Sequence, residues 1–301
     1  MKRKALFPLF ILFVIFFKPL YGEQTGIIQK KEVIVLFNKP LRIAAKEVAD
    51  IYSGLKAELE KMLRWKLNFR PTVLLIKNRD VFQRMAGSNL VVAFAMPQRK
   101  LVVIDCSKIN AYPFALGITL KHELCHLLLH NYIKRGNLPK WLDEGVCQFV
   151  SDGIAEILMY KKRSVLNEAT LSGKYISIKD LTERFPKDEK PLLLAYEESK
   201  SLVEYIISKF GRNGILKILE YLKDGDEVDV AILKSLSISF DELERRWHNH
   251  LSKRITWFTY LSNNIYGMLF FLAALITIYG FIRLLKKKRA YKDEEDDYYF
   301  L

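Results

Sequence analysis

The chain has 301 residues, a mean hydropathy near zero and a formal net charge of +14 at pH 7. Its basic residues are spread widely and are not paired with aromatic side chains that could stack on bases, so no nucleic-acid partner is expected. Between two apolar ends, the chain is long enough to bury a sizeable core in one or two domains.

The amino terminus, residues 1–22, has the pattern of a signal peptide. Three basic residues at positions 2–4 precede an apolar run over residues 5–17, which has the length of a signal-peptide core and is too short for a membrane span. We expect cleavage after Gly22. An uncleaved anchor is the alternative, because the small-residue cleavage pattern is weak.

Residues 23–110 are expected to form a small mixed β-sheet packed on one long helix. The helix is predicted at residues 40–65 from the helical spacing of apolar side chains, and the strands from runs rich in β-branched residues. The predicted strands lie at residues 32–37, 72–77, 91–96 and 101–105. The last two flank a Pro-Gln-Arg-Lys stretch and are expected to pair as a hairpin.

Residues 111–255 are predicted to be mostly helical. Pro139 suits the first turn of a helix, and Gly211 is typical of a helix end. The predicted helices cover residues 114–130, 139–161, 192–210, 213–223 and 239–253. Residues 164–191 are less regular, with short strand character at 175–178. The predicted fold class is therefore α+β.

Residues 265–285 are predicted to form a transmembrane helix. The segment carries no charge until Arg283, is long enough to cross a hydrocarbon core of roughly 30 Å, and is followed by four basic residues at 286–289. The positive-inside rule then places the tail, residues 286–301, in the cytoplasm. With an exported amino terminus, residues 23–264 lie in the periplasm or outside the cell, and the chain is a single-pass protein of the cell membrane.

Two histidines form the clearest chemical motif. His122 and His126 are four residues apart in the predicted helix 114–130, so their imidazoles share one face and can bind one zinc ion. Glu144, in the first turn of the next predicted helix, supplies a third ligand and leaves the fourth position for water. Glu123 is adjacent to a ligand, so its carboxylate can take a proton from that water as it attacks a carbonyl.

His130 extends the same ladder and competes with Glu144 as the third ligand. On a continuous helix it lies about 12 Å along the axis from His122, so Glu144 is preferred and His130 is expected to be a surface histidine. His248 and His250 lie far along the chain with no ligand set near them.

The cysteines are Cys106, Cys125 and Cys147. The second and third fall on the two helices expected to hold the metal. A disulfide between them is one possibility, and buried free thiols, which behave as small apolar residues, are the preferred one.

The His-Glu-x-x-His stretch at 122–126 and the Trp-Leu-Asp-Glu-Gly stretch at 141–145 resemble the gluzincin zinc metallopeptidases, particularly the peptidase MA-like family. The stretches at 195–199 and 243–247 also look like the carboxyl-terminal helices of that family. The resemblance covers roughly residues 110–255. It implies a thermolysin-like catalytic domain, with a sheet whose edge strand lines the cleft and a helical, zincin-like second half.

The resemblance also suggests a tyrosine hydroxyl that stabilises the oxyanion. Tyr196 is the candidate, and a tyrosine that only packs is the alternative. The chain departs from the family pattern at Gln148, one turn after Glu144, where a hydroxyl or carboxylate often supports a ligand histidine. Asp143 could serve instead. The departure bears on catalytic strength more than on metal binding.

We therefore predict a membrane-tethered, exported zinc metallopeptidase that acts on peptides or proteins, with Glu123 as general base. Two other hypotheses remain open. One is a catalytically weak or inactive zinc-binding or substrate-binding module of the same fold, anchored at the membrane. The other is a purely structural membrane protein with a helical exported domain.

Overall fold

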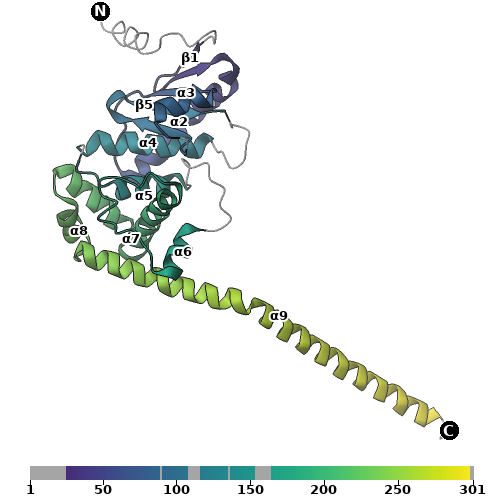
Figure 1. Ribbon diagram of the computed structural model, residues 1–301. Helices are drawn as coiled ribbons and strands as arrows, with labels where there is room; N and C mark the ends of the chain where they lie inside the picture. The colour runs from purple at the N-terminus through teal and green to yellow at the C-terminus, as the bar shows by residue number, and fades with distance from the viewer. Residues whose placement is uncertain (1–24, 89, 108–115, 135, 153–163, 299–301) are drawn as a thin grey trace, which may run out of the picture. The chain divides into compact units, whose positions relative to one another are not determined.

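The computed structural model describes residues 25–88, 90–107, 116–134, 136–152 and 164–298 (Figure 1). The predicted signal peptide, residues 1–22, lies outside the described residues. The chain divides into two units, Met1–Trp247 and His248–Leu301. We describe each unit by itself.

The first part of the larger unit contains a five-stranded mixed sheet with the order β1-β2-β3-β5-β4. Strands β2, β3 and β5 run parallel, whereas β1 and β4 pair antiparallel with β2 and β5 at the two edges. The strands are β1 (Thr25–Gln29), β2 (Ile34–Asn38), β3 (Thr72–Ile76), β4 (Ala93–Met96) and β5 (Leu101–Asp105). The mixed sheet expected from the sequence is confirmed, including the hairpin of β4 and β5.

Alternate residues of the central strands face opposite layers of helices. Helix α3 (Arg79–Ala86) covers one face, where Phe82 packs against Leu74 of β3 and Val103 of β5. The long helix α2 (Arg42–Leu63) contacts β2 and the helix α4 (Leu116–Tyr132), which in turn contacts β4 and β5. The short helices η1 (Lys39–Leu41) and η2 (Pro97–Arg99) precede α2 and β5.

The second part of this unit is helical, and α4 lies between the sheet and the other helices (Figure 1). Helix α5 packs against both α4 and α7, while α6 and α8 pack on α7. The helices are α5 (Lys140–Ser151), α6 (Val165–Ser172), α7 (Glu189–Asp224) and α8 (Val228–Leu236). This arrangement places α4 and α5 side by side in the interior.

Several predicted boundaries change. Helix α5 ends at Ser151 rather than at residue 161, because Asp152 adopts a left-handed backbone conformation with φ 58°. No strand forms at residues 175–178, where the described backbone is irregular. Gly211, with φ 71° and ψ 170°, does interrupt the helical run, as predicted, within the span of α7.

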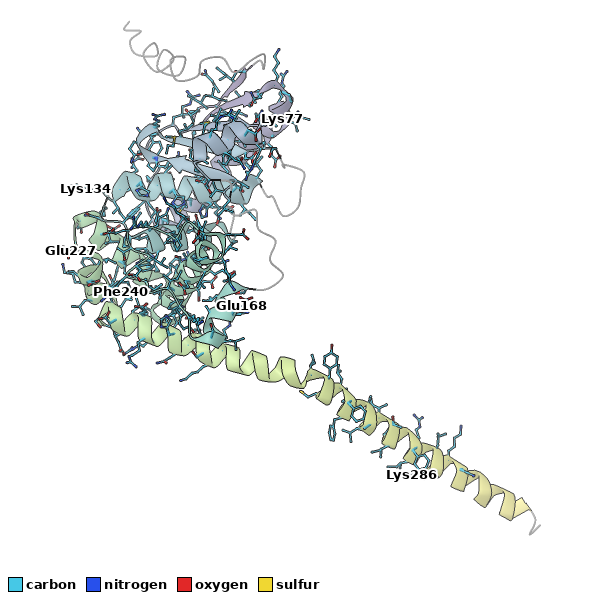
Figure 2. The ribbon with its side chains drawn as sticks, in the orientation of Figure 1. Lys77, Lys134, Glu168, Glu227, Phe240 and Lys286 are labelled. Atoms are coloured by element: carbon cyan, nitrogen blue, oxygen red, sulfur yellow. The ribbon has the colours of Figure 1, made fainter. Side chains whose placement is uncertain are left out.

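The last helix, α9 (Phe240–Tyr298), begins in the larger unit, where the Ser239 hydroxyl accepts a hydrogen bond from the Glu242 backbone N–H at 3.2 Å. In the smaller unit, its segment Ile265–Lys288 is long and apolar enough to cross a membrane. Apolar side chains along it are exposed, and Lys286 lies near its end (Figure 2). The predicted apolar helix is therefore present, at slightly different bounds.

Candidate metal centre

Helix α4 carries the first part of the site. Almost every residue from Leu116 to Leu129 is buried, since the helix is covered on both sides. His122 and Glu123 are completely buried, and His126 is 6% exposed. Polar side chains are rarely buried so deeply unless they bind a partner, which makes this turn of the helix a candidate functional site.

Glu144 of α5 meets the two histidines. The Nε2 atoms of His122 and His126 lie 3.1 Å apart, and Glu144 Oε2 lies 3.5 Å from each. Zinc bound tetrahedrally at roughly 2.0–2.1 Å from its ligands holds neighbouring ligand atoms about 3.3 Å apart. The three atoms therefore form one face of a tetrahedron of the size that zinc requires.

Two features fix the position of Glu144. The first N–H groups of α5 are satisfied by the chain's own carbonyls, since Lys140 N donates to Thr182 O at 2.7 Å and Trp141 N donates to Leu181 O at 3.1 Å. Next to Glu144, the absence of a side chain at Gly145 lets α5 approach α7 closely. The Glu-Gly pair thus combines a candidate ligand with the close helix contact that positions it.

Lys140 forms an ion pair with the other oxygen of Glu144, Oε1, one turn earlier on α5. Burial alone would raise the pKa of Glu144, but the cation of Lys140 and the imidazole of His126 hold that pKa well below its ordinary value. The carboxylate is therefore ionised, with one oxygen on Lys140 and the other facing the histidines.

Asp143 supports His126 from the neighbouring position on α5. Its Oδ1 accepts a hydrogen bond from His126 Nδ1 at 2.7 Å, and its Oδ2 accepts one from His130 Nε2 at 3.0 Å. Burial disfavours the charged imidazole, but the carboxylates of Asp143 and Glu144 raise the pKa of His126 well above its ordinary value. His130 is only a quarter exposed and contacts Asp143, so it is less open to solvent than the sequence suggested.

Gln148 lies one turn after Glu144 and is completely buried. Neither atom of its side-chain amide has a hydrogen-bond partner among the described residues. Asp143, the substitute expected from the sequence, does accept a hydrogen bond from the histidine His126.

Tyr196 is buried in an apolar cluster with Val165 and Leu193. Its ring meets the ring of Phe185 edge-on, with 5.1 Å between centroids, and the Phe185 centroid lies 6.0 Å from Lys140 Nζ. Tyr196 is thus linked to the site through Phe185 and Lys140. Its role in stabilising an oxyanion stays a prediction.

The two glutamates after Tyr196 bind an earlier part of the chain, and the sequence pattern did not predict these contacts. Glu197 accepts hydrogen bonds from the Ser164 hydroxyl and from Leu166 N at 2.9 Å, so it caps the start of α6. Glu198 accepts one from Ile176 N at 3.1 Å. The one sequence signal for these contacts is the pair of acidic residues beside a tyrosine. It does not identify the partners, because they lie more than twenty residues away along the chain.

The three cysteines are buried free thiols. Cys147 Sγ lies 3.4 Å from His126 Nδ1, on the side away from the Nε2 that faces Glu144. Burial raises the pKa of Cys147 well above its ordinary value, so its sulfur is a neutral thiol and a poor metal ligand.

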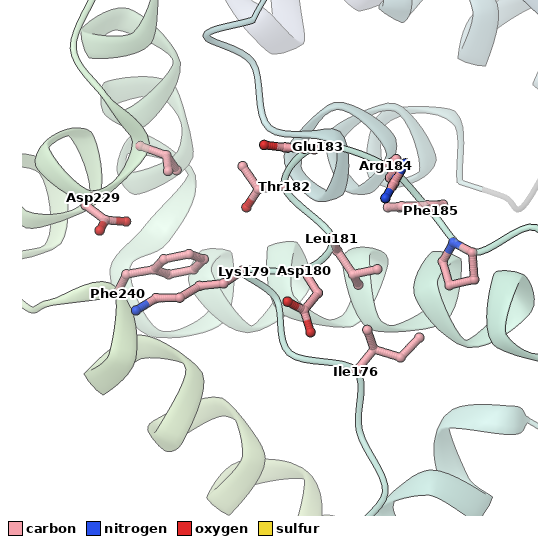
Figure 3. A pocket seen from close by; sticks show the side chains of 12 residues that line it. Ile176, Lys179, Asp180, Leu181, Thr182, Glu183, Arg184, Phe185, Asp229 and Phe240 are labelled. Atoms are coloured by element: carbon pink, nitrogen blue, oxygen red, sulfur yellow. The ribbon is translucent and has the colours of Figure 1, made fainter.

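A cavity of about 760 Å³ lies beside the start of α5. Its wall includes Leu181 and Thr182, together with Phe185 and Phe240 (Figure 3). The carbonyls of Leu181 and Thr182 are those that accept hydrogen bonds from the first backbone N–H groups of α5. The cavity is not lined by His122, His126 or Glu144. The cavity is therefore separate from the proposed metal ligands.

The comparison with protein families agrees with this geometry. The family model of the Peptidase MA superfamily matches residues 90–253, more than half of the chain, so the chain belongs to this superfamily. The predicted peptidase MA-like family is confirmed, and the domain is of the metallopeptidase type.

Among solved structures, the chain is similar to native yeast LTA4 hydrolase, with 13% sequence identity and a TM-score of 0.44. The match covers 76% of this chain and 38% of that one, so this chain spans well under half the length of the larger enzyme. No curated protein matches.

Proposed function

We propose that the protein is a membrane-tethered, exported zinc metallopeptidase. The observation that carries the proposal is the triangle of 3.1, 3.5 and 3.5 Å between His122 Nε2, His126 Nε2 and Glu144 Oε2. Two neutral nitrogens and one carboxylate oxygen form a donor set that suits catalytic zinc. The family to which the chain belongs supports the same reading.

His122, His126 and Glu144 would hold the ion. When bound, zinc would lower the pKa of a water to about 7 and polarise the carbonyl of the scissile peptide. Asp143 keeps the His126 ring oriented by accepting its Nδ1–H, which leaves Nε2 free to ligate.

Glu123 acts as the general base. It follows His122 directly on α4 and is completely buried, so its carboxylate is excluded from bulk water. It takes a proton from the attacking water and passes it to the leaving amine, which completes the cleavage of the C–N bond. Tyr196 is proposed to donate its hydroxyl hydrogen to the developing oxyanion, and the burial of its ring beside Phe185 supports a fixed position.

The substrate is proposed to be a peptide bound in extended form along β4. This strand is an edge of the sheet and contacts α4, the helix that carries the two histidines. An extended peptide can add to such an edge through main-chain hydrogen bonds. The edge strand therefore supports peptides over small esters as the substrate class.

Membrane attachment is proposed through the segment Ile265–Lys288, which has the length and composition of a single span. The basic residues at 286–289 support a cytoplasmic position for its carboxyl-terminal side, by the positive-inside rule. The catalytic unit then lies outside the cytoplasm, tethered to the bilayer.

The test uses the full-length chain in detergent, loaded with zinc, and a library of peptides. Wild-type protein should bind one zinc and cleave peptides, while Glu123→Gln should keep the zinc and lose hydrolysis by several orders of magnitude. Glu47→Gln, an exposed glutamate of α2, is the matched control and should cleave as wild type does. Equal hydrolysis by Glu123→Gln would overturn the mechanism.

One observation favours a second function, a zinc-binding or substrate-binding module with weak or no activity. Gln148 stands uncharged and buried beside the site, at a position where the family pattern often has a carboxylate or hydroxyl. One equivalent of zinc without cleavage of any library peptide would establish this alternative.

A further inference from the structure

We propose that His130 is a positioning residue, which fixes the proposed metal ligand His126 through the carboxylate of Asp143. The three side chains form a hydrogen-bonded chain from His130 Nε2 to Asp143 Oδ2, at 3.0 Å, and from Asp143 Oδ1 to His126 Nδ1, at 2.7 Å. The inference rests on the proposed metal site and extends it by one residue.

The spacing of the helices makes this chain possible. His126 and His130 are four residues apart on α4, so their rings lie on one face of the helix. Asp143 faces both rings from α5, and each of its carboxylate oxygens accepts a hydrogen bond from one of them. Since a carboxylate accepts only, both histidines donate N–H, so His126 donates through Nδ1 and its Nε2 is the atom that faces Glu144.

A metal ion between these three residues is the other reading, because their ligand atoms also lie within 4.8 Å of one another. The distances argue against it. An ion bound at roughly 2.0–2.1 Å would separate its ligand atoms by about 3.3 Å. The observed 2.7 Å between His126 Nδ1 and Asp143 Oδ1 is instead that of a direct, charge-assisted hydrogen bond, and His130 Nε2 binds the other carboxylate oxygen.

His130 matters because Asp143 is buried, with a side chain only 5% exposed. A buried carboxylate oxygen that loses its hydrogen bond is costly. The next cation, Lys140 Nζ, lies 3.9 Å from Oδ2, which is too far for a hydrogen bond. Without His130, the carboxylate would therefore turn toward Lys140 and move away from His126.

His126 would then lose its strong acceptor. Another group near its Nδ1 is the sulfur of Cys147, at 3.4 Å, and a thiol is a weak acceptor. The imidazole would no longer be held at one angle to Glu144. Partners of this kind change metal affinity by about 10–100-fold when they are removed.

The experiment measures the Kd for zinc of the full-length, metal-stripped chain by competition with a chelator, and the visible spectrum of the cobalt(II)-loaded chain. His130→Phe keeps the ring volume but removes the donor, and should weaken zinc about 10–100-fold and alter the cobalt spectrum. His130→Gln restores an N–H donor, so it should recover most of the zinc affinity and most of the wild-type cobalt spectrum. His250→Phe is the control and should match wild type in both.

A double-mutant cycle separates positioning from a general loss of folding. Because His130 acts through Asp143, adding His130→Phe to Asp143→Asn should weaken zinc little beyond Asp143→Asn alone. Additive losses would overturn the inference. So would an unchanged Kd in His130→Phe, or a second zinc equivalent that disappears with His130.

The outcomes also separate this inference from the proposed function. A wild-type chain that binds zinc but cleaves nothing contradicts the peptidase and leaves the role of His130 intact if the Kd shifts. A wild-type chain that cleaves peptides while His130→Phe binds zinc equally contradicts only the role of His130. A wild-type chain that binds no zinc contradicts both.

Discussion

Gly145 and Ser199 bring α5 and α7 into backbone contact: a Cβ on Gly145 would lie 2.4 Å from the Ser199 carbonyl oxygen and 2.7 Å from a methyl group of Val203. No side chain fits at such distances. The glycine that follows Glu144 is therefore required by packing, and the packing determines where Glu144 lies.

Gly145→Ala should destabilise the chain by about 1–3 kcal/mol, because α5 must move away from α7. Gly54→Ala is the matched control, since Gly54 lies inside α2 with nothing within 4 Å of its would-be Cβ. Alanine there should stabilise by up to about 1 kcal/mol. Urea unfolding of the full-length chain in detergent measures both, and a gain in stability at position 145 would contradict the account.

Lys140→Met should destabilise the metal-free chain by about 1–3 kcal/mol, because buried Glu144 loses its cation while the lysine itself is partly exposed. Zinc can supply the missing positive charge, so the rise in Tm on adding zinc should be larger in the variant than in wild type. Lys190→Met, which removes an exposed pair with Glu168, is the control and should leave that rise unchanged. Equal zinc-induced rises in all three chains would refute the role of Lys140.

Glu198 predicts a pH dependence of stability. Its burial, with help from Glu244 and Glu197, raises its pKa from 4.5 to about 8, although the Ile176 N–H works in the opposite direction. Between these values the unfolded chain releases the proton and the folded chain keeps it, so stability falls as pH rises through this window.

Glu198→Gln keeps an oxygen for Ile176 and cannot ionise, so it should unfold like wild type at pH 4.5 and be more stable by about 2–4 kcal/mol above pH 8. Denaturant unfolding across this range measures the difference. Glu47→Gln, the same substitution at an exposed glutamate, is the matched control. A constant difference between Glu198→Gln and wild type would contradict the assigned shift.

The proposed topology predicts which part of the chain a protease can reach. Protease added outside intact cells or spheroplasts should digest residues 23–264 and spare the tail after Lys286, detected by an antibody to the tail. A control with permeabilised membranes should lose the tail as well. Protection of the central unit would place the site in the cytoplasm.

Helix α4 was predictable because two independent signals coincide in it, a helical pattern of leucines and the His-Glu-x-x-His spacing. The choice of Glu144 as the third candidate ligand followed from its place in the first turn of the next predicted helix. The hairpin of β4 and β5 was predictable from apolar runs around a short polar stretch.

Other elements lack such a signal. Helix α3 has only eight residues and buries only Phe82 fully, so its apolar pattern covers little more than two turns, although Asn78 caps its start. Strand β1 buries no residue completely, because it is an exposed edge. The contacts of Glu197 and Glu198 depend on tertiary structure. His130 was judged by its distance from His122 along one helix, whereas its partner Asp143 approaches from another.

Zinc K-edge X-ray absorption of the loaded full-length chain tests the central claim most directly. The account predicts one zinc with only nitrogen and oxygen neighbours at about 2.0–2.1 Å, including two imidazoles, and loss of one imidazole in His126→Ala. Sulfur at about 2.3 Å would mean that Cys147 or Cys125 binds the metal, and would contradict a site built from His122, His126 and Glu144.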